Sequence, residues 1–184
     1  MQNLPLDDVY GPLVRECLKN SRLAQKELYG KLAPRMYSLC IRYVGNTETA
    51  KDILHDGFIA LFSKLDKYKG EGSFEGWARR IFINTALMYL RKSDVLKYSD
   101  DITQTGVDLR KAPNAVEKLE AEWLMKLICR MPAGFRTVFN MYAIEGYTHQ
   151  EIAKELKITE GGSRSQLSRA RIWLQERLQE INGR

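Results

Sequence analysis

The chain has 184 residues, of which 44% are apolar and 28% are charged. This balance is typical of a folded protein with one medium domain or two small ones, and it excludes wholesale disorder. Three widely spaced cysteines and two histidines offer neither a disulfide framework nor metal-ligand spacing, so we expect no metal and no cofactor. A secretory signal and a bilayer-length apolar run are both missing, which predicts a cytoplasmic location.

The formal net charge of +6 suggests a polyanionic partner. The basic excess lies in two separate pieces. Residues 1–94 carry 15 basic and 11 acidic side chains, whereas residues 116–184 carry 11 and 9. The stretch between them carries three of each and is neutral.

Helical periodicity dominates the first half of the chain, and strand signals are almost absent. Pro34 falls inside one apolar pattern and should kink that helix or split it in two. Ser73 is placed to cap the helix that follows a glycine-containing loop at 67–72. We predict helices over about 7–20, 21–45, 47–66 and 74–93.

The periodic pattern breaks at residues 94–113, which are polar and lack helical spacing. Because about twenty such residues are unusual inside one compact domain, we predict two small helical domains, 1–94 and 114–184, joined by a flexible linker at 95–113. Thr148 and Glu151 form a capping box. Later helices are expected to about residue 130, over 132–145, over 149–156 and over 160–181. The fold class is therefore all-α.

The last two predicted helices are separated by a turn of three or four residues, which describes a helix-turn-helix within a four-helix domain. The second of them is rich in arginine, which suits guanine edges and phosphates. A solvated basic face on an ordinary helical hairpin is the alternative. The residues expected to face inward are Ile152, Ala153, Leu156, Ile158 and Leu167.

Aromatic and cationic side chains interleave over residues 74–92. Aromatic faces beside cations suit unstacked bases and a phosphate track. The spacing of Trp77 and Phe82 equally permits a place in the core, so this alternative stays open.

These stretches, in this order, resemble bacterial sigma factors of the extracytoplasmic-function (ECF) group. Residues 50–65 resemble the second region of such factors, and FEGWARRIFINTALMYLRK at 74–92 fits its Phe-x-x-Trp…Arg-Ile-x-x-Asn signature. LICRMP at 127–132 resembles the turn before region 4, and residues 146–171 resemble the region 4 helix-turn-helix. The resemblance covers roughly 20–92 and 115–178.

The resemblance implies a promoter-specificity subunit without enzymatic activity or a small-molecule substrate. It would bind core RNA polymerase, through the coiled coil of the largest subunit and the flap, and promoter DNA. An anti-sigma factor, often membrane-anchored in the family, is a further expected partner. The residues matched to the −10 element are Tyr68, Lys69, Phe74, Trp77, Arg80, Asn84, Arg91 and Lys92. Those matched to the −35 element are Arg164, Ser165, Ser168, Arg169 and Arg171, and those matched to core polymerase are Asp52, Asp56, Phe58 and Ile59.

Several positions depart from the family pattern. Gly161 and Gly162 open the arginine-rich helix where one glycine followed by threonine is usual, and Ser163 replaces a common valine. Lys157 stands where glycine is frequent, and His55-Asp56 replaces the usual Gln-Glu.

Two other function classes are alternatives to a promoter-specificity subunit. A stand-alone helix-turn-helix repressor or activator would use the N-terminal half for dimerisation or effector binding. An enzyme would need a catalytic constellation, and no such set of residues is apparent. Asp100 and Asp101 are compatible with a linker that enters the polymerase active-site channel, and a solvated spacer is an equally open alternative.

Overall fold

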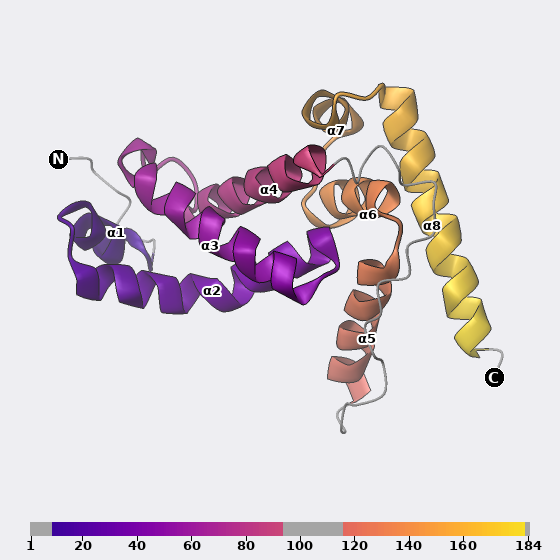
Figure 1. Ribbon diagram of the computed structural model, residues 1–184, viewed down its shortest axis with the longest axis horizontal. Helices are drawn as coiled ribbons and strands as arrows, with labels where there is room; N and C mark the ends of the chain where they lie inside the picture. The colour runs from indigo at the N-terminus through magenta and orange to yellow at the C-terminus, as the bar shows by residue number, and fades with distance from the viewer. Residues whose placement is uncertain (1–8, 94–115, 183–184) are drawn as a thin grey trace. The chain divides into compact units, whose positions relative to one another are not determined.

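The computed structural model describes residues 9–93 and 116–182, so the predicted linker at 95–113, with Asp100 and Asp101, lies outside the described residues. Every element of the described residues is helical, which confirms the all-α prediction (Figure 1). The chain divides into two compact units. The first holds the described residues up to Ile41 and Thr47–Tyr89, and the second holds Arg42–Asn46 and the described residues from Leu90 onward. The exact domain boundaries stay predictions.

The first unit is a small helical core built mainly by three long helices. Four side chains of α2, spaced by four, four and three residues, are fully buried and form its centre. These are Leu28, Leu32, Met36 and Leu39. Its elements are α1 (Gly11–Leu18), α2 (Arg22–Val44), α3 (Thr47–Ser63), the short 3₁₀ turn η1 (Leu65–Lys67) and α4 (Phe74–Lys92), except that the last residues of α2 and α4 belong to the second unit.

A kink or a split was expected at Pro34, and the split does not occur, since helix α2 runs without interruption through this residue. Pro34 has no N–H, and the helix loses one backbone hydrogen bond to the carbonyl four residues earlier. Leu32 and Met36, on either side, are both fully buried. Their burial offsets the lost hydrogen bond and holds the helix together.

Helices α3 and α4 approach each other closely at Gly57. A Cβ atom on Gly57 would lie 2.3 Å from Cε1 of Phe82, whose ring is fully buried. Phe58 packs edge-on against the same ring at 5.1 Å and lies 4.3 Å from the ring of Tyr29 on α2. Glycine at residue 57 is therefore what lets these aromatic rings fill the space between the helices.

The second unit contains the predicted four helices, α5 (Val116–Arg130), α6 (Ala133–Phe139), α7 (His149–Leu156) and α8 (Glu160–Asn182). The helix expected over 132–145 begins as α6 and continues without a break into η2 (Asn140–Ile144), so its last turn is π-helical. Gly146, with φ +76°, ends it. A core cluster of Leu127, Met131, Ala170 and Leu174 packs against Trp123, Phe135, Phe139 and Trp173.

The three cysteines are buried and serve as small apolar core residues. Burial raises the pKa of the Cys40 thiol to about 12, and burial likewise raises the pKa of Cys17 and of Cys129.

Because the thiolate is the reactive form, we expect an aromatic disulfide reagent at about pH 8 to label the folded protein very slowly and to label all three thiols in denaturant. Release of the coloured thiol measures this, and fast labelling before denaturation would contradict it.

Candidate nucleic-acid interface

A loop held by an aromatic cluster precedes helix α4. Tyr68 donates a hydrogen bond from its hydroxyl to the carbonyl oxygen of Gly72, at 2.8 Å, and so closes the loop on itself. Gly70 and Gly72 both have positive φ, which glycine adopts without strain. Ser73 then caps α4 by accepting from the backbone N–H of Gly76 at 2.9 Å, as predicted.

The rings of Tyr68, Phe74 and Trp77 pack together, with centroids 5.2 to 5.6 Å apart. Phe74 is fully buried and Tyr68 nearly so, whereas Trp77 is half-buried. The matched roles of Tyr68 and Phe74 in base contact stay predictions, but their burial favours support of Trp77 over direct contact. Trp77 is the ring of this cluster that reaches the surface.

The outer side of α4 gathers the other residues matched to the −10 element. Three residues of α4 follow Trp77 at helical spacing: Arg80, Asn84 and Arg91 lie three, seven and fourteen positions after it. At 3.6 residues per turn, all four side chains fall on one side of the helix. Arg80, Asn84 and Arg91 are exposed, as are Lys92 at the end of the helix and Lys69 in the loop. An amide, two arginines and one aromatic edge therefore lie on this side of the helix, which we call the α4 face, and the two exposed lysines lie in the preceding loop and at the helix end.

The residues matched to core polymerase separate into two groups on α3. Asp52, Asp56 and Ile59 are exposed at positions that share one side of the helix, and Ile59 is 56% exposed. His55 lies on the same side and is also exposed. Phe58 is buried among other rings, so its placement favours a core role.

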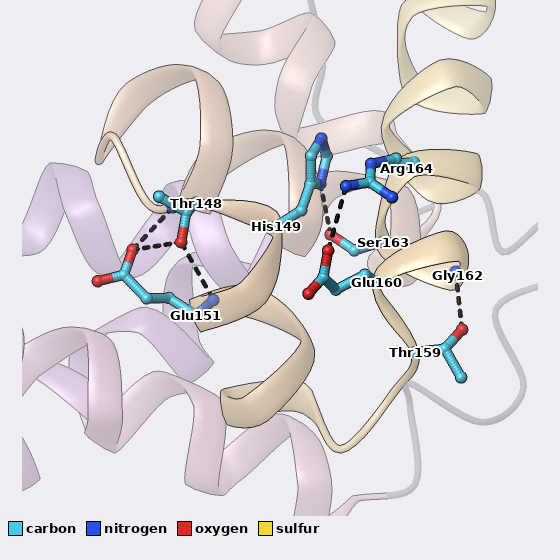
Figure 2. A network of polar contacts seen from close by, with 8 residues as sticks. All are labelled: Thr148, His149, Glu151, Thr159, Glu160, Gly162, Ser163 and Arg164. Carbon is cyan, nitrogen blue, oxygen red and sulfur yellow. Dashed lines mark hydrogen bonds and ion pairs between the residues drawn. The ribbon is translucent and has the colours of Figure 1, made fainter.

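Both helices of the helix-turn-helix are capped at their N-terminal ends (Figure 2). Oγ1 of Thr148 accepts from the backbone N–H of Glu151 at 3.2 Å, and the Glu151 carboxylate accepts from the backbone N–H of Thr148 at 2.8 Å. This is the predicted capping box. Across the turn, Oγ1 of Thr159 accepts from the backbone N–H of Gly162 at 2.9 Å and caps α8.

Helix α8 exposes all five residues matched to the −35 element. Arg164, Ser168 and Arg171 form one stripe, and Ser165 and Arg169 lie beside it, so we call this surface the α8 face. Arg164 pairs with Glu160 at 3.1 Å, an exposed contact that costs little to release when another anion approaches. Such a row of exposed arginines and hydroxyls suits the edges and phosphates of a DNA groove.

One inward-facing expectation for this motif is wrong. Ile152, Ala153 and Leu167 are buried and Leu156 is partly buried, but Ile158 is 38% exposed. The cause lies in the preceding residue, because Lys157 adopts left-handed backbone angles, which bend the chain away from the helical path.

Both faces lie within segments of the chain that match known family models. The family model for Sigma-70 region 2 matches residues 28–95, and the model for Sigma-70, region 4 matches residues 121–174. Together they include α4 with its preceding loop, α7, and α8 as far as residue 174. The chain belongs to the sigma-70 factors of the ECF group.

Characterised sigma factors match this chain over nearly its full length. The RNA polymerase sigma-H factor of Pseudomonas aeruginosa is 24% identical, with 92% of this chain and 93% of that protein covered. The ECF RNA polymerase sigma-E factor of Escherichia coli is 26% identical, with 92% and 94% covered. A solved structure of the sigma factor RpoE in complex with the anti-sigma factor NepR, from Bartonella quintana, shares the fold, with a TM-score of 0.56 and 21% identity over 84% of this chain and 96% of that one.

The function of this sigma factor is promoter-specific initiation of transcription. Within the described residues, no helix is long and apolar enough to cross a membrane.

Two residues of this sigma factor that sequence reasoning did not assign meet at the helix-turn-helix. Nδ1 of His149 lies 2.9 Å from Oγ of Ser163, in hydrogen-bonding contact, and Ser163 is fully buried (Figure 2). The available signal was the polar Ser163 at a position where the family commonly has valine. A buried hydroxyl needs a partner, and one of only two histidines in the chain supplies it.

Lys157 has φ +56°, a left-handed conformation that costs a residue with a Cβ atom about 1 kcal/mol or more. We expect Lys157→Gly to raise the free energy of unfolding of this unit by about 0.5–1 kcal/mol. The matched control is Lys154→Gly, inside α7, which should lower it by about 1 kcal/mol. Chemical denaturation monitored by circular dichroism measures both, and equal effects of the two changes would contradict the strain argument.

Proposed function

We propose that the α4 face and the α8 face read two separate elements of a promoter, the −10 and the −35 element. The observation that carries this proposal is that each face is exposed and cationic and lies within a matched sigma-70 region. Cations on both faces would place the protein along the phosphate backbone and make binding depend on salt.

At the α4 face, Trp77 and Asn84 would hold a base that has left the duplex stack. Unstacking costs a few kcal/mol, which an aromatic edge and an amide can return through stacking and hydrogen bonds. Arg80, Arg91 and the neighbouring lysines would contact phosphates of the opened strand. This division supports a role in strand opening as well as in recognition.

At the α8 face, Arg164 and Arg169 would reach base edges in the major groove, with Ser165 and Ser168 between them. Arg171 is better placed for a phosphate, because it lies further along the helix, away from the N-terminal turns that enter the groove. The guanidinium of Arg171 lies 6.0 Å from the ring centroid of Tyr142, which holds it in place at the surface.

The exposed side of α3 would bind the coiled coil in the largest subunit of core RNA polymerase. The second unit would bind the flap of the polymerase. Asp52, Asp56 and Ile59 combine two charges with one exposed apolar side chain, a composition that suits a specific but reversible interface. We propose further that the protein acts in the cytoplasm, catalyses no reaction itself and takes no small-molecule substrate.

An anti-sigma factor is a further proposed partner. It is supported by the solved sigma factor RpoE, whose structure was determined with the anti-sigma factor NepR. Such a partner would control when the two DNA-reading faces become accessible to DNA. In this family the anti-sigma factor is often anchored in the membrane.

Copurification with core polymerase tests the proposal against a stand-alone repressor or activator. We expect the wild-type protein to form a complex with core polymerase and to direct initiation from a promoter selected by that complex. Ile59→Asp should lower retention of the protein by core polymerase about tenfold or more, because it removes an exposed apolar contact and adds a charge.

Leu23→Asp on α2 is the matched control, because Leu23 is more exposed than Ile59, and it should retain normal binding. Specific DNA binding in the absence of any polymerase complex would favour the stand-alone regulator instead.

A further inference from the structure

The N-terminal turn of α8, the recognition helix, is joined to α7 by a buried polar contact. Ser163 is completely enclosed, and its Oγ lies 2.9 Å from Nδ1 of His149 (Figure 2). His149 is the first residue of α7, and Ser163 is in the first turn of α8. The contact therefore ties the beginnings of the two helices directly together, across the turn of the motif.

His149 is itself held from a third element. Its ring stacks on Tyr142 of the π-helical segment η2, with centroids 4.5 Å apart and an angle of 23° between the rings. Tyr142 in turn lies beneath the guanidinium of Arg171 on the α8 face. A continuous line of contacts thus runs from the buried Ser163 through His149 and Tyr142 to an exposed cation.

Apart from the Thr159 cap and the exposed Arg164–Glu160 pair, two glycines leave the first turn of α8 weakly restrained. Gly161 and Gly162 contribute no Cβ atoms, and glycine weakens a helix by about 1 kcal/mol per residue relative to alanine. A fully buried serine without a partner would add a desolvation cost. The hydrogen bond to His149 removes that cost only when α7 and α8 are correctly placed, so it selects one arrangement of the two helices.

That turn is followed at once by Arg164 and Ser165, which the proposed function assigns to base edges. A small rotation of the turn would move both side chains relative to the groove, because base readout depends on donor and acceptor positions at hydrogen-bond distance. Phosphate contacts tolerate such a shift better, since they depend mainly on charge.

We propose that His149 is a positioning residue that sets the orientation of the recognition helix, and so determines −35 specificity without touching DNA. This inference rests on the proposed function, in which α8 reads the −35 element. It predicts that loss of His149 lowers discrimination between sequences while most of the non-specific affinity remains.

The test compares His149→Ala with His149→Asn and with the double variant His149→Ala/Ser163→Val, all in the full chain bound to core polymerase. Each variant is measured below its unfolding temperature, as determined by circular dichroism. The readout is the ratio of affinities for a selected promoter and for the same promoter with a scrambled −35 element.

We expect His149→Ala to lower this ratio about tenfold, the amount that one lost buried hydrogen bond corresponds to. Asparagine carries a polar atom close to the position of Nδ1, so His149→Asn should recover most of the ratio. The double variant should also recover part of it, because the hydroxyl that needed a partner is gone and valine restores apolar burial.

A direct probe of the contact accompanies these measurements. The ¹⁵N chemical shift of Nδ1 of His149 should change in Ser163→Ala, while that of His55, which is exposed on α3, should not.

An unchanged affinity ratio in His149→Ala, together with a lowered ratio in Arg169→Ala, would overturn the positioning role and leave the proposed function standing. An unchanged ratio in both variants would overturn the proposed reading of the −35 element and the inference with it. Equal losses in His149→Ala, His149→Asn and the double variant would also contradict the role assigned to the hydrogen bond.

Discussion

Arg169→Ala is expected to weaken binding to a −35 duplex by about 10- to 100-fold, the 1–3 kcal/mol that a good base contact is worth, and to relax the choice of base at one position. Asn84→Ala should leave that duplex binding nearly intact and impair strand opening instead, because its proposed ligand is an unstacked base. The two residues lie in different units of the protein, so their effects should be separable.

Gel shifts on −35 duplex and permanganate footprinting of the melted region measure the two effects with the same holoenzyme preparations. Lys154→Ala, an exposed cation on α7 outside both faces, serves as the control and should change neither. Equal losses of duplex binding from Asn84→Ala and Arg169→Ala would contradict the division of roles. Trp77→Ala is a poorer probe, since Trp77 packs against Tyr68 and Phe74 and its removal would disturb the fold around the loop.

Gly57→Ala should lower the free energy of unfolding of the first unit by about 1–3 kcal/mol, although it adds a single methyl group. The new Cβ would meet the Phe82 ring at 2.3 Å, far inside van der Waals contact. That ring is fully buried and packed edge-on against Phe58, so it has no space into which to move. Either the ring leaves its rotamer or α3 and α4 separate, and both responses cost packing energy.

Gly30→Ala on α2 is the matched control for that change. Nothing lies within 4 Å of a Cβ at Gly30, so alanine should raise the free energy of unfolding by about 0.5–1 kcal/mol through its higher helix propensity. Urea denaturation followed by circular dichroism gives both values. Similar effects of the two substitutions, in sign and size, would mean that the close approach at Gly57 does not limit packing.

Local chemistry predicted much of the helical framework. The capping box at Thr148 and the serine cap at Ser73 were both predicted from residue type and spacing, because each depends on atoms a few residues apart. The left-handed glycine that ends α2, Gly45, likewise depends only on local backbone chemistry. Pro34 was harder, since whether a proline splits a helix depends on the burial of its neighbours, and this is a tertiary property.

In the candidate site, too, helix spacing predicted the placement of some residues and left that of others open. The five residues of the α8 face are exposed together because their spacing alone sets their side of the helix. Around α4 the spacing left core and surface open for the aromatic rings, and the structure places Phe74 inside and Trp77 at the boundary. The contact of His149 with Ser163 joins residues fourteen positions apart on different helices, and no local pattern encodes such a meeting.

The π-helical segment Asn140–Ile144 makes the local fold sensitive to the number of residues in this part of the chain. A π turn accommodates one residue more than an α turn, so the segment acts as an insertion absorbed within a helix rather than in a loop. Loss of one residue there would return the path to an α-helix and rotate everything beyond it by about 100°. The ring of Tyr142 would then no longer face His149. A single deletion in the segment would therefore uncouple it from α7, whose first residue stacks on Tyr142.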